Sequence, residues 1–195
     1  QVIRTGRVRW AFGQIETILI SSFTFVILAI GMTGILLLPN VTLSEGWGKV
    51  LYTLSMTGAS GDFNIPFSIP YEIISKYTVF EGLGVTILVG GMVIAFIGLL
   101  MFCISLIGSR LLANVVAMVF VIMPMIQLNI GMAVPELDYV SPVSWMNLSK
   151  IDITGTGSGL PLSDCATILG IMCILLSIAI IWKIKTVDFQ IVKED

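Results

Sequence analysis

One stretch of the sequence, Val79–Ile107, is more apolar than a helix on the surface of a soluble protein can be. Its only ionisable side chain is Glu81, near its start, and no charge follows from Gly82 onward. About 20 residues of helix cross the hydrocarbon core of a bilayer, and this run is longer. It also lacks the polar face of an amphipathic helix. The stretch therefore predicts a membrane-spanning helix that is long enough to tilt.

The composition supports the same class of protein. Hydrophobic residues make up 56% of the 195-residue chain and charged residues 11%, whereas roughly a quarter of the residues in ordinary globular domains are charged. With a net charge of −2, the chain offers no concentrated basic face, so we expect no nucleic-acid partner. The expected fold is an all-α integral membrane protein, a polytopic helix bundle.

Three further apolar runs complete a single predicted transmembrane domain over residues 1–195. The four expected spans are 15–38, 79–107, 111–134 and 165–182. The very short turn at residues 108–110 requires the second and third spans to run antiparallel. The longer segments 39–78 and 135–164 form the predicted outer loops, and a short helix against the membrane surface is expected over residues 45–56.

The positive charges give these four helices an orientation. Seven lysines and arginines fall in segments on the side of the chain termini, namely Arg4, Arg7, Arg9, Arg110, Lys183, Lys185 and Lys193. The other three, Lys49, Lys76 and Lys150, fall in the two outer loops. Because cytoplasmic loops carry an excess of lysine and arginine, the ends 1–14 and 183–195 are predicted to be cytoplasmic, in a multi-pass protein of the cell membrane.

Motifs that would indicate an enzyme are missing from the sequence. The chain has no histidine, so a serine in the Gly-Ala-Ser-Gly segment at 58–61 has no imidazole base. Three scattered cysteines without an imidazole do not make a usual zinc site. No GxxxxGK[ST] phosphate loop is present. We expect no enzymatic activity, no cofactor and no metal, and any ATP hydrolysis would belong to another subunit.

Polar and small residues inside the spans are candidates for packing or transport. Gln127 and Asn129 lie within the third run, where polar groups should face protein or a water-filled path; we take them as possible path-lining residues. Pro124 in the same run predicts a kink. Small residues between positions 90 and 98 allow close helix contact, either within one chain or at a dimer seam.

Three short segments resemble the membrane permeases of type-2 ABC exporters from Gram-positive bacteria. The basic segment from Arg4 to Trp10, followed by Gly13 and Gln14, is similar to the one that precedes their third transmembrane helix. The segments 47–51 and 139–145, Trp-Gly-Lys-Val-Leu and Tyr-Val-Ser-Pro-Val-Ser-Trp, are similar to outer segments that several of these permeases carry. The resemblance covers most of the chain.

The resemblance implies a role and a set of partners. Such permeases have six transmembrane helices, and this chain, which begins with Gln1 rather than Met, would supply the third to the sixth and lack the first two. Arg4, Arg7, Arg9 and Trp10 would lie at or beside the segment that couples to an ATP-binding cassette subunit. The permease would work in the lipid bilayer as a homodimer or heterodimer of permease chains, in a bacterium.

We therefore favour a membrane permease subunit of an ABC transporter that exports a substrate while a separate subunit hydrolyses ATP. The alternative is a non-transporting membrane anchor, assembly factor or sensor that uses its outer loops. A secondary transporter would need ionisable groups near the middle of the spans, where the sequence has none. A membrane enzyme is the weakest alternative, and the sequence does not specify a substrate.

Overall fold

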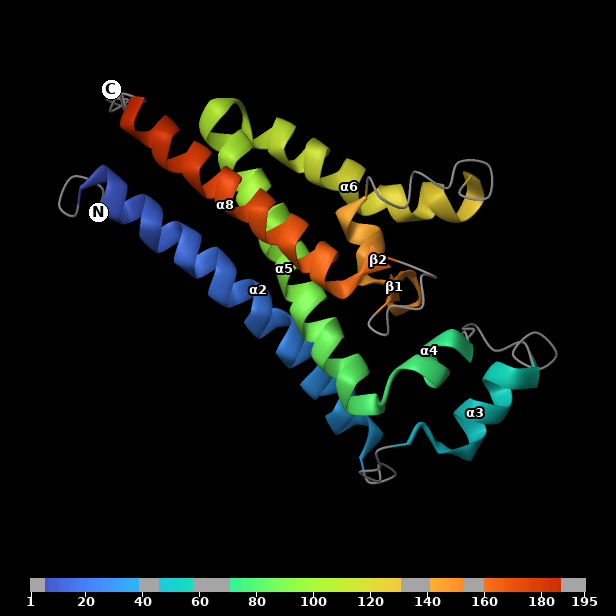
Figure 1. The fold of residues 1–195 in the computed structure, drawn as a ribbon. Coiled ribbons are helices and arrows are strands. Elements are labelled where there is room, and N and C mark those ends of the chain that lie inside the picture. Colours follow the sequence, from blue (N-terminus) through green and yellow to red (C-terminus); the bar gives the residue numbers. More distant parts are fainter. Residues whose placement is uncertain (1–5, 39–45, 58–70, 131–140, 153–159, 187–195) are drawn as a thin grey trace.

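The structure, a computed structural model, describes residues 6–38, 46–57, 71–130, 141–152 and 160–186. Four helices dominate it: α2 (Arg7–Leu37), α5 (Val79–Ile107), α6 (Arg110–Ile130) and α8 (Leu162–Thr186) (Figure 1). The shorter elements are α3 (Gly48–Thr57), α4 (Tyr71–Lys76), the 3-10 helices η1 (Pro142–Met146) and η2 (Leu148–Lys150), and the strands β1 (Ile151–Asp152) and β2 (Leu160–Pro161). The two strands pair in parallel, with Ile151 opposite Leu160. The all-α class is confirmed.

Three of the four expected spans form helices that are long and apolar enough to cross a membrane: α2, α5 and α8. In α6 the apolar part is shorter, Arg110–Ile126. That range covers only residues whose side chains the structure describes, and the helix itself continues to Ile130. The last residues expected for this span, 131–134, lie outside the described part of the chain. The structure thus shows three candidate membrane-spanning helices and a shorter fourth apolar helix.

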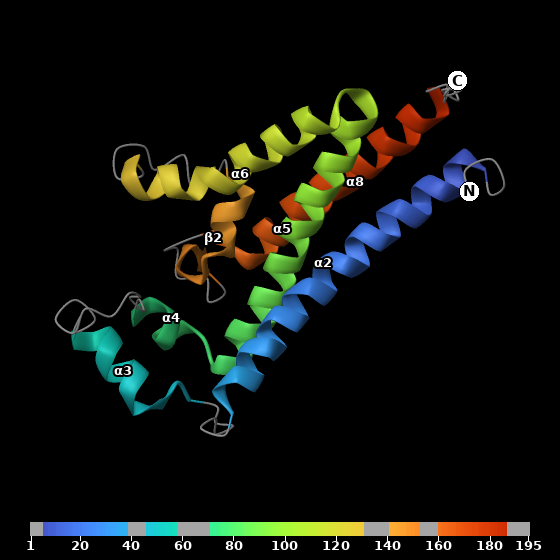
Figure 2. The ribbon, with the colours of Figure 1, turned by 180° about the vertical axis from the view of Figure 1, so that it is seen from behind.

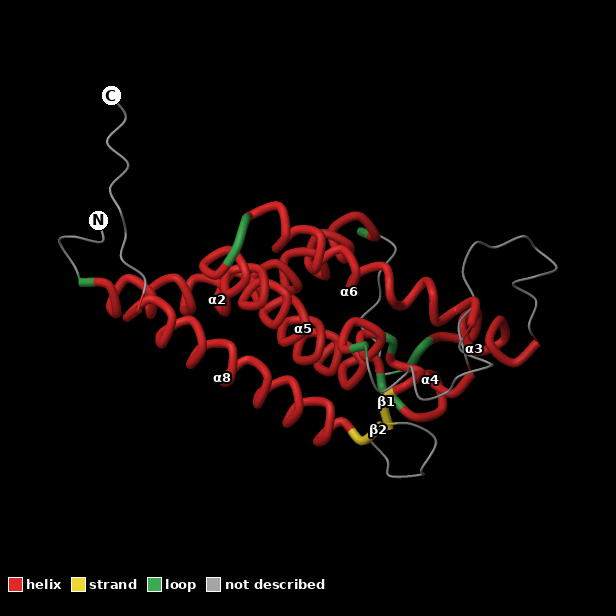
Figure 3. The backbone as a smooth tube through the Cα atoms, turned by 90° about the horizontal axis from the view of Figure 1, so that it is seen from above, coloured by secondary structure: helices red, strands yellow, loops and turns green. Residues whose placement is uncertain are grey.

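Helix α5 is the centre of the bundle. Helices α2, α6 and α8 all pack against it, and it lies between α8 and α6 when the molecule is seen from above (Figure 3). Its first residue, Val79, and its last, Ile107, are those that the sequence predicted. A capping box fixes the start: the Glu81 N–H donates to Thr78 Oγ1, at 3.3 Å, and the Thr78 N–H donates to Glu81 Oε2, at 2.9 Å.

Glycines on α5 allow α2 to approach closely. A Cβ at Gly91 would overlap the ring of Phe23, and one at Gly98 would lie 2.8 Å from Cγ2 of Ile18. Both neighbours belong to α2 of the same chain. These small residues therefore serve helix packing within the chain, one of the two uses that the sequence allowed for them.

The ends of the outer helices differ from the expected spans. Helix α2 begins at Arg7 rather than at residue 15, and α8 runs from Leu162 to Thr186 rather than over 165–182. Trp10 explains part of the extension, because its ring packs edge-on against Phe102 of α5, with centroids 6.0 Å apart. An apolar run marks where a helix meets lipid, whereas helical hydrogen bonding continues into the charged flanks.

The outward faces of the long helices are covered by large apolar side chains. The exposed ones on α2, α6 and α8 include Phe25, Leu28, Met32, Leu36, Leu111, Val115, Met118, Ile171, Leu175 and Ile178. In water, the hydration of this apolar surface would be unfavourable, whereas lipid tails are as apolar as the side chains themselves. The arrangement is that of a membrane protein.

Candidate functional site

One end of the bundle gathers basic side chains from three places in the sequence. The start of α2 and the end of α8 lie near each other there, together with the turn between α5 and α6 (Figure 1). The basic residues at this end are Arg7, Arg9, Arg110, Lys183 and Lys185. Arg4, the remaining arginine of the expected coupling segment, lies outside the described residues.

The coupling residues that the structure describes lie in the first turn of α2. Arg7 and Arg9 are exposed, while Trp10 is half-buried against α5 and the adjacent Ala11 is fully buried. Positive charge at a helix N-terminus opposes the helix macrodipole, by about 0.3–1 kcal/mol in comparable cases. The dipole of α2 therefore does not favour the charges of Arg7 and Arg9.

At the opposite end of the bundle, Tyr77 connects three distant segments. Its hydroxyl donates to the carbonyl of Ile151 at 2.6 Å, and its own carbonyl accepts from Nε1 of Trp47, also at 2.6 Å. Tyr77, Trp145 and Ile151 are all buried in one cluster with residues of the first two thirds of α5 and the start of α8. This cluster holds the segments that follow α2 and α6 against the end of the bundle.

Several polar groups are buried around Tyr77. Asp152 and Ser144 are nearly inaccessible, and Ser141 is completely so. The hydroxyl of Ser141 has no hydrogen-bond partner among the described atoms. Burial, and then the charge of Asp152, raise the pKa of Tyr77 above its usual range, with a smaller contribution from Cys165. Tyr77 therefore remains a neutral hydrogen-bond donor at physiological pH.

The 3-10 helix η1 reaches well down the bundle, between α5 and α6. The methyl carbon of Met146 lies 3.6 Å from where Gly90 would carry a Cβ, and Gly90 is about 17 Å along α5 from Val79 at about 1.5 Å per residue. Turns satisfy the backbone of η1: the Ser144 N–H donates to the carbonyl of Ser141 at 3.0 Å, and the Asn147 N–H to that of Ser144 at 3.1 Å. A segment that is not α-helical therefore lies at the depth of the central apolar helix.

A pocket of about 470 Å³ separates η1 and η2 from the later part of α6. Its lining residues are Val121, Pro124, Met125, Val143, Ser144, Met146, Asn147 and Lys150. Helix α6 visibly changes direction along its length (Figures 1 and 2), and Pro124, at which the sequence predicted a kink, lies inside this helix. A proline has no N–H, so the carbonyl of Phe120 loses its helical donor.

The expected path-lining residues, Gln127 and Asn129, follow Pro124 on the same helix. Their side chains lie outside the described part of the structure, so their role stays a prediction. The polar residues that do line the pocket are Ser144, Asn147 and Lys150, and none of them was predicted from the sequence to line a path. They lie in the segment that follows α6 in the sequence, and only the return of this segment to the side of α5 brings them to the pocket.

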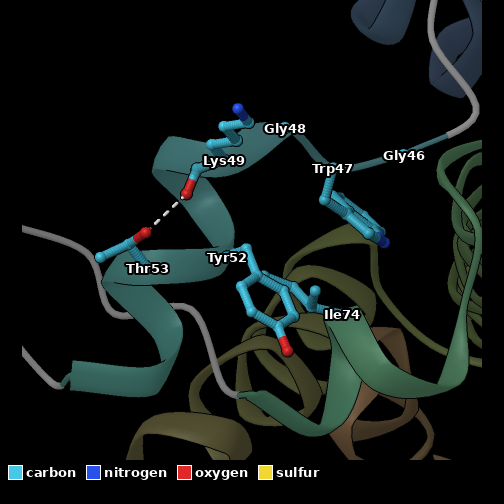
Figure 4. A pocket seen from close by; sticks show the side chains of 7 residues that line it. All are labelled: Gly46, Trp47, Gly48, Lys49, Tyr52, Thr53 and Ile74. Atoms are coloured by element: carbon cyan, nitrogen blue, oxygen red, sulfur yellow. Dashed lines mark hydrogen bonds between the residues drawn. The ribbon is translucent and has the colours of Figure 1, made fainter.

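A second, open pocket of about 600 Å³ lies between α3 and α4 (Figure 4). The rings of Trp47 and Tyr52 and the side chain of Ile74 line it, while the side chain of Lys49 points away from both rings. Helix α3 forms where a surface helix was predicted, and its exposed Val50 and Met56 are of the kind that contact a membrane interface. Together α3 and α4 stand to one side of the bundle (Figure 2).

In the part of the chain described here, no three histidine, cysteine, aspartate or glutamate side chains come together as metal ligands. Cys103, Cys165 and Cys173 are free thiols, the first two buried.

No protein family, curated protein or solved structure was found to match this chain. The functional interpretation therefore rests on the residues and their geometry.

Proposed function

We propose that this chain is the membrane permease subunit of an ABC exporter, driven by ATP hydrolysis on a separate subunit. The placement of η1, between α5 and α6 at the depth of Gly90, carries the proposal. A membrane anchor needs only apolar helices. Backbone that is not regular helix is tolerated at membrane depth where it is buried in protein or lines a cavity, and η1 does both, which favours a protein that provides a path.

The relative directions of the helices support four crossings of the membrane. The start of α8 packs with Val85 and Tyr77, while its end packs with Ala11 at the start of α2. If α2, α5 and α8 cross the membrane, the chain must return from Arg110 to the start of α8 across the same thickness. In this proposal α6 and the segment after it make that crossing, with both ends of the chain on the basic, cytoplasmic side.

The basic end is the proposed site of coupling. Arg7 and Arg9 are exposed at the start of a helix whose dipole disfavours them, and an acidic surface on an ATPase subunit would stabilise them. Trp10 connects this turn to the central helix through its edge-on contact with Phe102. Movement of a docked ATPase would thus be transmitted to α5. Two permease chains, identical or related, would enclose the transport path.

Purification of the protein in mild detergent from its native membrane tests the proposal. We expect an ATPase with a GxxxxGK[ST] loop to co-purify, and the double variant Arg7→Ala, Arg9→Ala to lose most of it. The matched control is Lys49→Ala, an exposed lysine on α3 at the other end of the molecule, which should retain the ATPase. Repeated purification without any ATPase would refute the proposal. Full recovery by the double variant would refute only the assigned coupling site.

One observation favours the alternative, a membrane anchor or sensor. The unit of α3 and α4 carries an open aromatic pocket at the side of the bundle (Figure 4), as a receptor for an external ligand would. A sensor would bind its ligand through Trp47 and Tyr52 and would need no ATPase. Loss of function in Tyr52→Ala, in a protein that purifies without an ATPase, would support this alternative.

A further inference from the structure

We propose that the pocket between α6 and the segment η1–η2 binds an anionic phospholipid of the surrounding bilayer. Its phosphate would lie at Asn147 and Lys150, and one acyl chain would lie between Val121 of α6 and Met146 of η1. The proposal concerns a resident lipid, and it holds whether or not the chain is a permease.

The segment η1–η2 runs along the axis of α5. Met146, which lines the pocket, lies beside Gly90. Leu148, the residue that follows Asn147, reaches Gly82, with 4.0 Å between its Cδ1 and the site of a Cβ. Gly82 and Gly90 are about 12 Å apart at about 1.5 Å per helical residue. In this proposal the acyl chain lies at the level of Gly90 and the head group lies toward the level of Gly82, nearer the start of α5.

Two side chains at the polar wall suit a phosphate. Asn147 Oδ1 accepts from the N–H of Ser149 at 3.1 Å and from its hydroxyl at 2.9 Å. These two bonds identify the amide oxygen of Asn147 as the atom that faces Ser149, and they leave its NH₂ group as a donor. Lys150 makes an interaction within the chain and is the sole ionisable residue among those that line the pocket. Its ammonium has three N–H donors and can serve more than one acceptor.

The apolar wall of the pocket is exposed at the surface of the molecule. Val121 and Met125 on α6 are 55% and 68% exposed, and Met146 opposite them is 42% exposed. In a bilayer these side chains contact acyl chains from outside the molecule. Pro124 lines the pocket together with Val121 and Met125, so an acyl chain in the pocket would contact the same helix that carries these exposed side chains.

Photo-crosslinking of the full chain in vesicles tests the proposal. The probes are a phosphatidylglycerol and a phosphatidylcholine that carry the same photoreactive acyl chain, each in trace amount in phosphatidylcholine vesicles. We expect phosphatidylglycerol to label the pocket segments more strongly, and Lys150→Gln to lower that preference about fivefold. Lys150→Arg should retain it, because charge is kept. Lys49→Gln, on α3, should leave it unchanged.

A second variant separates loss of binding from loss of folding. Asn147→Asp keeps the size of the side chain but places a negative charge beside the phosphate, so it should reduce labelling by phosphatidylglycerol, which has a net negative charge, more than labelling by the zwitterionic phosphatidylcholine. The ratio between the two probes is the readout, since a misfolded protein would lose labelling by both. Equal labelling by the two lipids in the unaltered protein, or an unchanged ratio in both Lys150→Gln and Asn147→Asp, would overturn the proposal.

Discussion

Gly91 is the position in the bundle where a side chain has the least room. A Cβ there would overlap the ring of Phe23 on α2. We expect Gly91→Ala to lower the free energy of unfolding by about 1–3 kcal/mol, the usual effect of overpacking. Unfolding in detergent micelles, followed by circular dichroism against a denaturant, would measure it. Combining it with Phe23→Ala should recover part of the loss, because the overlapping ring is removed.

Gly34 provides the matched control on α2. Among the described atoms, a Cβ at Gly34 would meet nothing within 4 Å. Alanine is the better helix former by up to about 1 kcal/mol, so Gly34→Ala should leave stability unchanged or raise it slightly. If Gly91→Ala behaved like Gly34→Ala, the close contact between α2 and α5 would be wrong.

The hydroxyl of Tyr77 connects the start of α5 to the strand β1 through its hydrogen bond to Ile151. Tyr77→Phe would leave the carbonyl of Ile151, buried beneath it, without the donor that now lies 2.6 Å away. An unsatisfied buried acceptor costs about 1–3 kcal/mol, and we expect a loss of that size. The same unfolding measurement at pH 7 checks it, and an unaltered midpoint would contradict the hydrogen bond.

The pH dependence of that difference follows from the raised pKa of Tyr77, caused first by burial and then by Asp152. Because the folded-state pKa exceeds that of the unfolded chain, the neutral phenol is favoured by folding. Its contribution is complete below about pH 10 and is lost as the pH rises through the folded-state pKa. The stability difference between the unaltered protein and Tyr77→Phe should therefore stay constant up to about pH 10 and shrink above it. A difference that shrinks on acidification instead would contradict this assignment.

At the scale of elements, α6 has two halves with different surroundings. Its first half is held on α5, where Ala113 and Ala117 are buried and Phe120 packs edge-on against Phe96 at 5.7 Å between centroids. Its second half turns away and borders the pocket with η1. We expect Pro124→Ala to straighten α6, because the carbonyl of Phe120 regains a helical donor.

Distances between spin labels would detect this straightening. Labels on two exposed residues of α6, Leu112 before the proline and Ile126 after it, should move apart in Pro124→Ala. The control is Val119→Ala, which removes an exposed side chain and changes no backbone hydrogen bond. An unchanged distance in Pro124→Ala would show that packing against η1, rather than the missing N–H, bends the helix.

The elements also show which features the sequence could reveal. The limits of α5 were predictable because local signals set them: Glu81 closes a capping box with Thr78, and apolar residues run without a break to Ile107. The position of η1 along α5 was not predictable, because Trp145 and Ser141 are buried by contacts with segments far away in the sequence. The hydrogen bond from Nε1 of Trp47 to the carbonyl of Tyr77 joins residues 30 positions apart, and no local sequence pattern indicates it. For the same reason the sequence indicated a path through Gln127 and Asn129, yet missed Asn147 and Lys150.

In the whole molecule, the described basic residues at the two ends of the chain and the buried polar cluster lie at opposite ends of the bundle. Among the described elements, five basic residues lie at the end where α2 begins and α8 ends, and the count in the sequence predicts that this end is cytoplasmic. The buried polar cluster around Tyr77 lies at the other end. A chain of three crossings would separate the two termini, whereas α2 and α8 pack with Arg7 and Lys183 at the same end. Four crossings with both termini in the cytoplasm is the arrangement on which the proposed function depends.

Accessibility of single cysteines in intact cells tests this arrangement most directly. In a background with Cys103, Cys165 and Cys173 replaced by alanine, a membrane-impermeant maleimide would be applied to Lys49→Cys, Arg110→Cys and Lys185→Cys. We predict that Lys49→Cys is labelled from outside, and that Arg110→Cys and Lys185→Cys are labelled only after the membrane is opened. Labelling of Lys185→Cys from outside, or of Lys49→Cys only from inside, would contradict the proposed crossing of the membrane.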